Sequence, residues 1–119
     1  QDIAPKVIAW FQPHGYGPTR FLKDDFIKEF SESLRPTDEL WMSEIFYAGG
    51  TAVKNISSLD IVTEISKNKK QAFFVEDRNN LFDEMKNHFS SDCVVLLMGA
   101  RDPGLEKFAE QFKEKLMSL

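Results

Sequence analysis

Four short apolar runs alternate with segments of helical period along this chain, and no other feature limits its possible folds as strongly. The runs cover residues 6–11, 39–46, 71–76 and 93–98. Each is followed by a segment whose apolar residues recur every three or four positions, as on one face of a helix. Strands that alternate with helices form βαβ units with parallel strands. The sequence therefore predicts an α/β fold: a three-layer, Rossmann-like domain with a mainly parallel sheet of at least four strands and helices on both faces.

The predicted helices are amphipathic and differ in how clearly their ends are marked. They cover residues 21–34, a segment from about residue 58, residues 81–89 and residues 105–116. Pro36 ends the first of them, because the residue before a proline avoids the helical conformation. The fourth apolar run, CVVLLM, has no polar alternation, which is typical of a strand buried on both faces. We therefore expect the first and fourth strands to be central in the sheet.

Size and charge narrow the class of protein. A chain of 119 residues is long enough for one domain with one core, and a hydrophobic content of 42% with 11 Phe residues indicates a globular protein. The net charge of -4 argues against partners such as nucleic acid or an anionic membrane, since both require a basic surface. No apolar run approaches the roughly 18 residues of a membrane span.

The single cysteine and the amino terminus indicate the cellular compartment of the protein and its domain organisation. Cys93 lies inside the fourth apolar run and is expected to be a buried strand residue. One cysteine cannot form a disulfide or a cysteine zinc site within the chain, which fits a cytoplasmic protein. The sequence begins at Gln1 without an initiator Met or a signal-like segment. We expect it to be one domain, residues 1–119, excised from a longer three-domain protein and lacking its early part.

A ligand site is expected at one edge of the predicted sheet. Open α/β sheets bind ligands at the carboxyl ends of their strands, where the strand order reverses. This rule selects the loops at residues 12–20, 47–54, 77–80 and 99–104. A strand order of 3-2-1-4 makes the first and fourth of these loops neighbours. His14 in the first loop and the Arg101-Asp102 pair in the fourth are then predicted to face one crevice.

A dinucleotide site is one interpretation of the first loop. Gly15 and Gly17 follow a predicted strand, and Glu44 near the end of the second strand could accept from a ribose hydroxyl. However, Arg20 stands where the fingerprint has the glycine that lets the helix pack closely against the strand. The sequence therefore disfavours this interpretation.

Two other phosphate-related patterns are absent from the sequence. The segment GGTAVK has two glycines and a lysine but lacks the GxxxxGK[ST] spacing of a P-loop. A response-regulator receiver domain would need acids after the first strand and a lysine after a fifth strand. Asp77 lies where its phosphoacceptor would be, but the first strand ends in Gln-Pro-His and no fifth strand follows.

Three motifs, in chain order, carry a resemblance to a known family. They are FQPHGYGPT after the first strand, FYAGG after the second and MGARD after the fourth. They resemble the motifs FQPHRYSRT, YAAGE and GAGD of the carboxy-terminal domain of the Mur ligases, in particular the members that add L-alanine. The matched positions are Phe11, Gln12, Pro13, His14, Tyr16, Thr19, Tyr47, Ala48, Gly50, Gly99, Ala100 and Asp102. The resemblance spans essentially the whole chain.

This resemblance implies part of an ATP-dependent amide ligase of peptidoglycan precursor synthesis. In that family ATP phosphorylates a carboxylate, and the amine of an amino acid attacks the acyl phosphate. The other two domains bind the UDP-sugar acid and carry the P-loop and the Mg²⁺ sites, and the carboxy-terminal domain closes over them to present the amine and part of the nucleotide. Such domains have a further strand and helix before the first motif, so the sheet of this chain is expected to be incomplete.

The resemblance also assigns candidate residues. It implies substrate-binding roles for His14, Tyr16, Thr19, Arg20, Tyr47 and Gly50, and roles in a nucleotide loop for Gly99, Ala100, Arg101 and Asp102. It implies no catalytic residue and no metal ligand in this domain. ATP and Mg²⁺ are expected in the complete enzyme and not in this domain alone, which we expect to be inactive.

The chain departs from the family motif where the amine would be recognised. Two arginines of the family motif, suited to grip a carboxylate as planar forks, are Gly15 and Pro18 here. Thr51 and Arg101 replace an acid and a glycine, and Arg20 is the nearby guanidinium. A paralogue that joins a different amine is therefore one interpretation. A Rossmann-like binding module that has lost ligation is the alternative.

Overall fold

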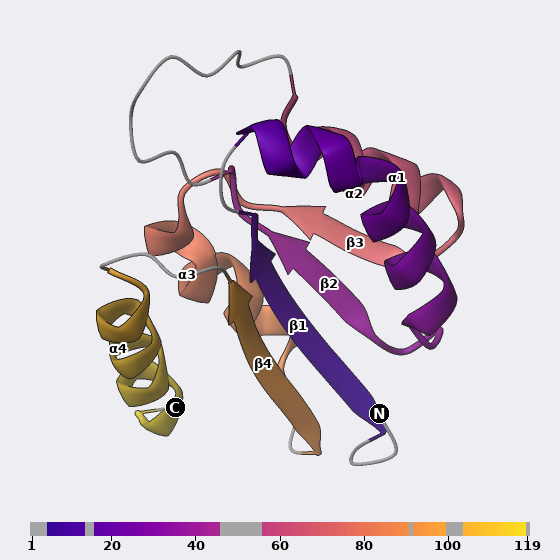
Figure 1. Ribbon diagram of the computed structural model, residues 1–119. Coiled ribbons are helices and arrows are strands. Elements are labelled where there is room, and N and C mark those ends of the chain that lie inside the picture. Colours follow the sequence, from indigo (N-terminus) through magenta and orange to yellow (C-terminus); the bar gives the residue numbers. More distant parts are fainter. Residues whose placement is uncertain (1–4, 14–15, 46–55, 91, 100–103, 119) are drawn as a thin grey trace.

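The computed structural model describes residues 5–13, 16–45, 56–90, 92–99 and 104–118, and for residues 16–18, 20 and 99 it describes the backbone alone. In chain order the elements are β1 (Lys6–Gln12), α1 (Tyr16–Ser33), β2 (Glu39–Met42), α2 (Ser58–Lys67), β3 (Gln71–Phe74), η1 (Arg78–Asn80), α3 (Leu81–Met85), η2 (Lys86–His88), β4 (Cys93–Gly99) and α4 (Leu105–Met117). The elements η1 and η2 are short 3₁₀ turns on either side of α3. Strands and helices alternate as the sequence predicts (Figure 1).

The four strands form one parallel sheet in the order β3-β2-β1-β4. Strand β1 pairs with β2 through Ile8 opposite Glu39, and with β4 from Lys6 opposite Cys93 onward. Strand β3 extends the sheet on the far side of β2. The predicted fold class and parallel pairing are therefore confirmed, and the strand order is the 3-2-1-4 arrangement on which the expected pairing of the first and fourth loops depends.

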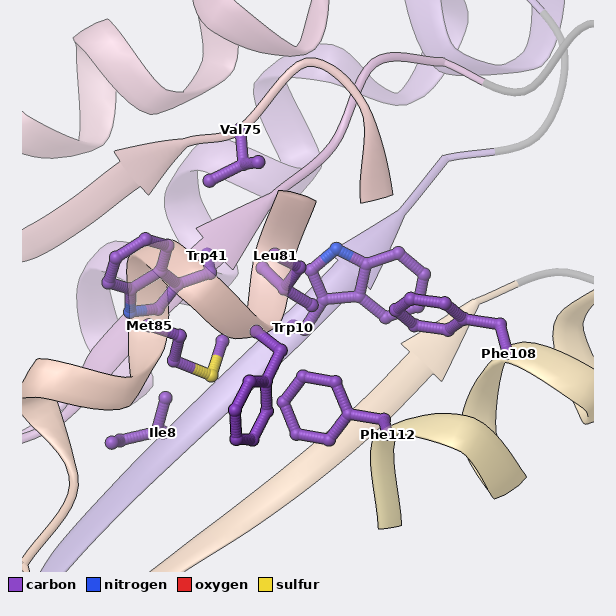
Figure 2. Close-up of a cluster of buried hydrophobic side chains, with 9 residues drawn as sticks. Ile8, Trp10, Trp41, Val75, Leu81, Met85, Phe108 and Phe112 are labelled. Atoms are coloured by element: carbon purple, nitrogen blue, oxygen red, sulfur yellow. The ribbon is translucent and has the colours of Figure 1, made fainter. Parts of the chain in front are cut away.

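Helices cover both faces of the sheet, with α1 and α2 on one side and α3 and α4 on the other (Figure 1). The core on the α1/α2 side consists of Ala9, Leu34, Leu40, Met42, Ile61, Val62 and Ile65. The core on the α3/α4 side consists of Ile8, Trp10, Trp41, Val75, Leu81, Phe82, Met85, Phe108 and Phe112. Figure 2 shows this second cluster, in which the buried Trp10 ring lies 5.0 Å from the Phe108 ring.

The position of β4 corrects one expectation. Strand β1 is central and buried from Val7 to Trp10, but β4 lies at an edge of the four-stranded sheet. Leu96 is 45% exposed and Met98 is 36% exposed. The reason is that α1 and α2 lie over the other three strands, which leaves an apolar groove of about 320 Å³ between α1 and β4. An unbroken apolar run indicates that a strand is more stable when it is buried, but it does not show that a helix covers the strand.

Helix α1 begins at Tyr16, five residues before the predicted start. Gly17 and Pro18 suggested a loop, yet both lie in its first turn. Proline is tolerated there, because the first four N–H groups of a helix have no partner within it. Most of the predicted loop at residues 12–20 is therefore helix.

The bounds of the remaining helices agree better with the sequence prediction, except that α3 is shorter than predicted. Helix α2 begins at Ser58, as predicted, after a capping box formed by Ser57 and Asp60. Helix α3 is only five residues long, because the 3₁₀ turn η2 replaces the second half of the predicted helix. None of the helices in the described segments is long and apolar enough to cross a membrane.

Candidate active-site edge

The carboxyl ends of β1 and β4 lie next to each other. Gln12, the last residue of β1, is paired in register with Gly99, the last residue of β4. The segments that follow these two strands therefore begin side by side. This confirms that the first and fourth strands are neighbours and brings together the starts of the two loops that carry most of the predicted site residues.

Gln12 holds the centre of this edge through both ends of its side-chain amide. Its Oε1 atom accepts a hydrogen bond of 3.0 Å from Nη1 of Arg78. Its Nε2 atom donates to the backbone oxygen of Glu44 over 2.9 Å. The end of β1 is thereby tied to the residues that follow β3 and β2.

Arg78 is itself held at the start of η1. Asp77 caps this turn by accepting from the backbone N–H of Asn79. The guanidinium carbon lies 5.3 Å from the centre of the Phe108 ring, a cation–π contact with α4. The side chain also lines a small cavity of about 30 Å³ between η1 and α4, to which Gln111 and Lys115 contribute.

The carboxylate of Glu44 lies at the amino terminus of α2. One oxygen accepts from the backbone N–H groups of Ile45 and Ser58, at 2.9 and 3.0 Å. The other accepts from the hydroxyl of Ser57 at 2.6 Å. An acid at this position is stabilised by the helix dipole. A ribose hydroxyl would have to displace these contacts, so the geometry does not support the dinucleotide interpretation of Glu44.

A buried hydrogen bond lies beneath the edge. The indole Nε1 of Trp10 donates to Oγ of Ser43 over 2.9 Å, and both residues are fully buried. Tryptophan N–H groups in a core need such a partner, because an unpaired buried donor destabilises the fold. The bond fixes the residue after β2 to the middle of β1.

Similar proteins are known for nearly the whole length of this chain. No family model matches the chain. The chain is 32% identical over 115 residues to the UDP-N-acetylmuramate–L-alanine ligase of Rickettsia felis, and 31% identical over 114 residues to that of Acetivibrio thermocellus. Both alignments cover 95% of this chain and 23% of the relative. The chain is homologous to one domain of the Mur ligase MurC.

A solved structure of MurC supports the same fold. The UDP-N-acetylmuramate–alanine ligase from Thermotoga maritima matches with a TM-score of 0.62 at 24% identity, over 95% of this chain and 20% of that protein. At that identity the likeness shows the fold alone. The chain spans less than a quarter of the length of these MurC relatives, so their whole activity does not transfer to it by homology alone.

The residues that the MurC-like motifs single out are only partly described. His14, Tyr47, Gly50, Ala100, Arg101 and Asp102 lie outside the described residues. Tyr16 and Arg20 lie in the first turns of α1, where the backbone alone is described. Thr19, also in α1, is 2% exposed, and Gly99 ends β4. Their proposed contacts with substrate and nucleotide stay predictions.

Sequence reasoning missed the parts played by Gln12, Glu44 and Arg78. Gln12 was matched to the family motif without a role, and Glu44 was considered only for a ribose. Arg78 gave no signal beyond its place after the third apolar run, although the Asp-x-Asn pattern at residues 77–79 is typical of a capped turn. Arg78 and Gln12 are 66 positions apart, so only the fold brings them together.

The amino ends of the strands, at the opposite edge of the sheet from the carboxyl ends, carry buried carboxylates. Glu39, 2% exposed, accepts from Nε1 of Trp41 at 2.9 Å and pairs with Nζ of Lys6 at 2.9 Å and Nδ1 of His88 at 3.1 Å. Burial raises the pKa of the Glu39 carboxyl, but the hydrogen bonds from these three side chains outweigh burial and hold the pKa below its ordinary value.

Asp38 is the second buried carboxylate at this edge. It accepts from the backbone N–H of Val7 at 2.9 Å and forms an ion pair with Arg35 at 3.0 Å. Burial raises the pKa of Asp38, while the hydrogen bonds from Arg35 and Val7 lower it further than burial raises it. Both carboxylates lie at the amino ends of the strands, away from the edge where parallel sheets bind ligands.

Proposed function

We propose that this chain is the substrate-presenting, carboxy-terminal domain of a cytoplasmic, ATP-dependent amide ligase of the Mur type. The complete protein is UDP-N-acetylmuramate–L-alanine ligase or a paralogue, and it acts in peptidoglycan precursor synthesis. Homology to MurC along 95% of the chain is the observation that carries this proposal. The parallel order that starts the β1 and β4 segments side by side supports it.

The proposed task of the domain is to bring the amine to an activated carboxylate. Holding two reactants in the right geometry can supply a large part of a rate enhancement, so a domain that presents one of them needs a firmly placed binding edge. Gln12, Glu44 and Arg78 give the carboxyl edge this firmness. ATP, Mg²⁺ and the UDP-sugar acid are proposed to bind to the complete protein. Among the residues that the structure describes, no group of three or more His, Cys, Asp or Glu could hold a metal ion.

The proposed amine contacts come from the family motif and its departures. We propose that His14, Tyr16, Thr19, Arg20, Tyr47 and Gly50 meet the amine substrate, and that Gly99, Ala100, Arg101 and Asp102 meet the nucleotide. Gly15 and Pro18 replace the two arginines of the family motif, which favours an amine other than L-alanine. Losing a charge-paired contact to a buried carboxylate costs about 2–5 kcal/mol.

The test is ligation by the complete protein with a panel of amino acids. Purified protein is incubated with ATP, UDP-N-acetylmuramate and one amino acid at a time, and mass spectrometry detects the ligated product. ATP-dependent addition of one amino acid supports the proposal. His14→Ala and Arg20→Ala are each expected to lower kcat/KM by about tenfold or more. A folded complete protein that ligates none of the amino acids would contradict the proposal and favour a binding module.

The isolated chain of residues 1–119 serves as the matched control in this assay. Its catalysis is expected to require closure of other domains over it. We predict neither ATP hydrolysis nor amide formation by this chain alone. Turnover by the purified chain that His14→Ala abolishes would show a self-contained site instead.

A further inference from the structure

A row of hydrogen bonds crosses the carboxyl edge from η1 to the start of α2. Arg78 donates to Gln12, Gln12 donates to the backbone oxygen of Glu44, and the Glu44 carboxylate accepts from Ser57 and Ser58. The row joins the residues after β3, the end of β1, the residues after β2 and one helix terminus. All of its bonds are partly buried, so they compete with water less than surface bonds do.

Two partners of opposite kind decide the orientation of the Gln12 amide. A glutamine amide has one acceptor and one donor end of nearly equal size, and it can turn over when its partners allow it. A guanidinium can only donate, and a backbone carbonyl can only accept. Arg78 on the oxygen side and Glu44 on the nitrogen side therefore exclude the turned-over amide.

Arg78 is suited to this task because its own place is fixed. Its backbone begins the capped turn η1, and its guanidinium lies over Phe108 of α4. Arginine remains charged at all relevant pH values and presents its donors in a rigid plane. The same side chain therefore anchors β1 to the α3/α4 side of the sheet and aims a donor at Gln12.

We propose that Arg78 is a positioning residue for amine recognition in the proposed ligase reaction, acting through Gln12. It holds the end of β1 in the orientation from which the following segment meets the amine. This inference rests on the proposed function. It does not require Arg78 to contact substrate, and it assigns a role to a position outside the three motifs shared with the Mur ligases.

The experiment compares five variants of the complete protein in steady-state ligation, the fifth being Arg78→Lys. Arg78→Met keeps an apolar side chain over Phe108 and removes the donor. Gln12→Leu removes both hydrogen bonds of the side-chain amide, and the double variant combines the two changes. Lys115→Met is the matched control, because Lys115 also lies over a phenyl ring, that of Phe82 at 5.8 Å. Thermal melts check that each variant is folded.

We expect Arg78→Met to raise KM for the amine about tenfold and KM for ATP less than twofold. The effect should fall mainly on the amine, because Arg78 positions the segment that meets the amine. The double variant should be no worse than Gln12→Leu alone, because Gln12→Leu already removes the bond that Arg78→Met breaks. Arg78→Lys, which keeps a donor, should recover part of the loss. Lys115→Met should behave like the wild type.

Three results would overturn the inference: unchanged KM for the amine in Arg78→Met, equal increases in both KM values, or effects of the two single variants that multiply. The wild-type protein separates this inference from the proposed function. Without ligation by the wild type, both statements fail. Ligation by the wild type combined with an unaffected Arg78→Met variant contradicts only the role of Arg78.

Discussion

The two edges of the sheet use polar residues in different ways. At the amino edge, Glu39 and Asp38 are 2% and 0% exposed, and each carboxylate is surrounded by charged and neutral donors from the chain itself. At the carboxyl edge, the side-chain amide of Gln12 and the guanidinium of Arg78 are only half buried. Their hydrogen bonds connect the starts of loops and do not bury a charge completely.

This difference separates stability from binding. Buried ion pairs are costly to break, because each leaves a charge or donor without its partner inside the protein. Half-buried hydrogen bonds can be exchanged for water at a small cost in stability, yet they fix the directions of the groups around them. We therefore expect substitutions at the amino edge to destabilise the domain and substitutions at the carboxyl edge to alter recognition.

The largest effect is expected from Glu39→Ala. This change removes the acceptor of Trp41 and the partner of Lys6 and His88, whose side chains are 23% and 32% exposed. The free energy of unfolding should fall by about 3 kcal/mol, near the lower end for a broken buried pair because Lys6 and His88 regain water. Urea unfolding of the chain, followed by tryptophan fluorescence, measures this change.

Glu64→Ala is the matched control for that prediction. Glu64 also pairs with a lysine, Lys67, at 3.1 Å, but on the exposed surface of α2. Its loss should lower the free energy of unfolding by less than about 1 kcal/mol. Equal losses in the two variants would show that burial of Glu39 does not matter.

The second effect is the dependence of stability on pH. Asp38 and Glu39 have pKa values below their ordinary 3.8 and 4.5 in the folded chain. Their contribution to the free energy of unfolding is therefore complete above these ordinary values and is lost as the pH falls through the lowered folded values. An Asp38→Asn/Glu39→Gln double variant should be less stable than the wild type at about pH 6, and the gap should narrow by about pH 3. A gap that widens on acidification would mean that these carboxylates do not stabilise the fold in their ionised form.

The order of elements could be predicted from the sequence because it rests on local patterns. The alternation of apolar runs and helical periods led to the parallel sheet, and the order 3-2-1-4 was the condition under which the first and fourth loops become neighbours. The start of α1 was missed because Pro18 is typical of a loop as well as of a first helical turn. The edge position of β4 was missed because the apolar run of residues 93–98 carries no information about what covers it.

The networks at the two edges could not be predicted, since they join residues far apart in the chain. Lys6 donates to the backbone oxygen of His88, 82 positions away, and His88 contacts Glu39, 49 positions away. His88 also lies edge-on against Trp41 and Phe73, a packing that no spacing in the sequence signals. The motif FQPH pointed to the end of β1 through a family resemblance, while the bonds that hold Gln12 there depend on the folded chain.

The most direct test of the contrast between the edges compares Gln12→Leu with Glu39→Gln in the complete protein. Ligation is measured as kcat/KM for the amine at a temperature where both variants are folded, and stability by urea unfolding. We predict that Gln12→Leu lowers kcat/KM about tenfold and the free energy of unfolding by less than about 1 kcal/mol. Glu39→Gln should lower stability more than Gln12→Leu does and leave kcat/KM within about twofold of the wild type. If Glu39→Gln reduced kcat/KM as much as Gln12→Leu did, the division of the sheet into a stabilising edge and a recognition edge would be wrong.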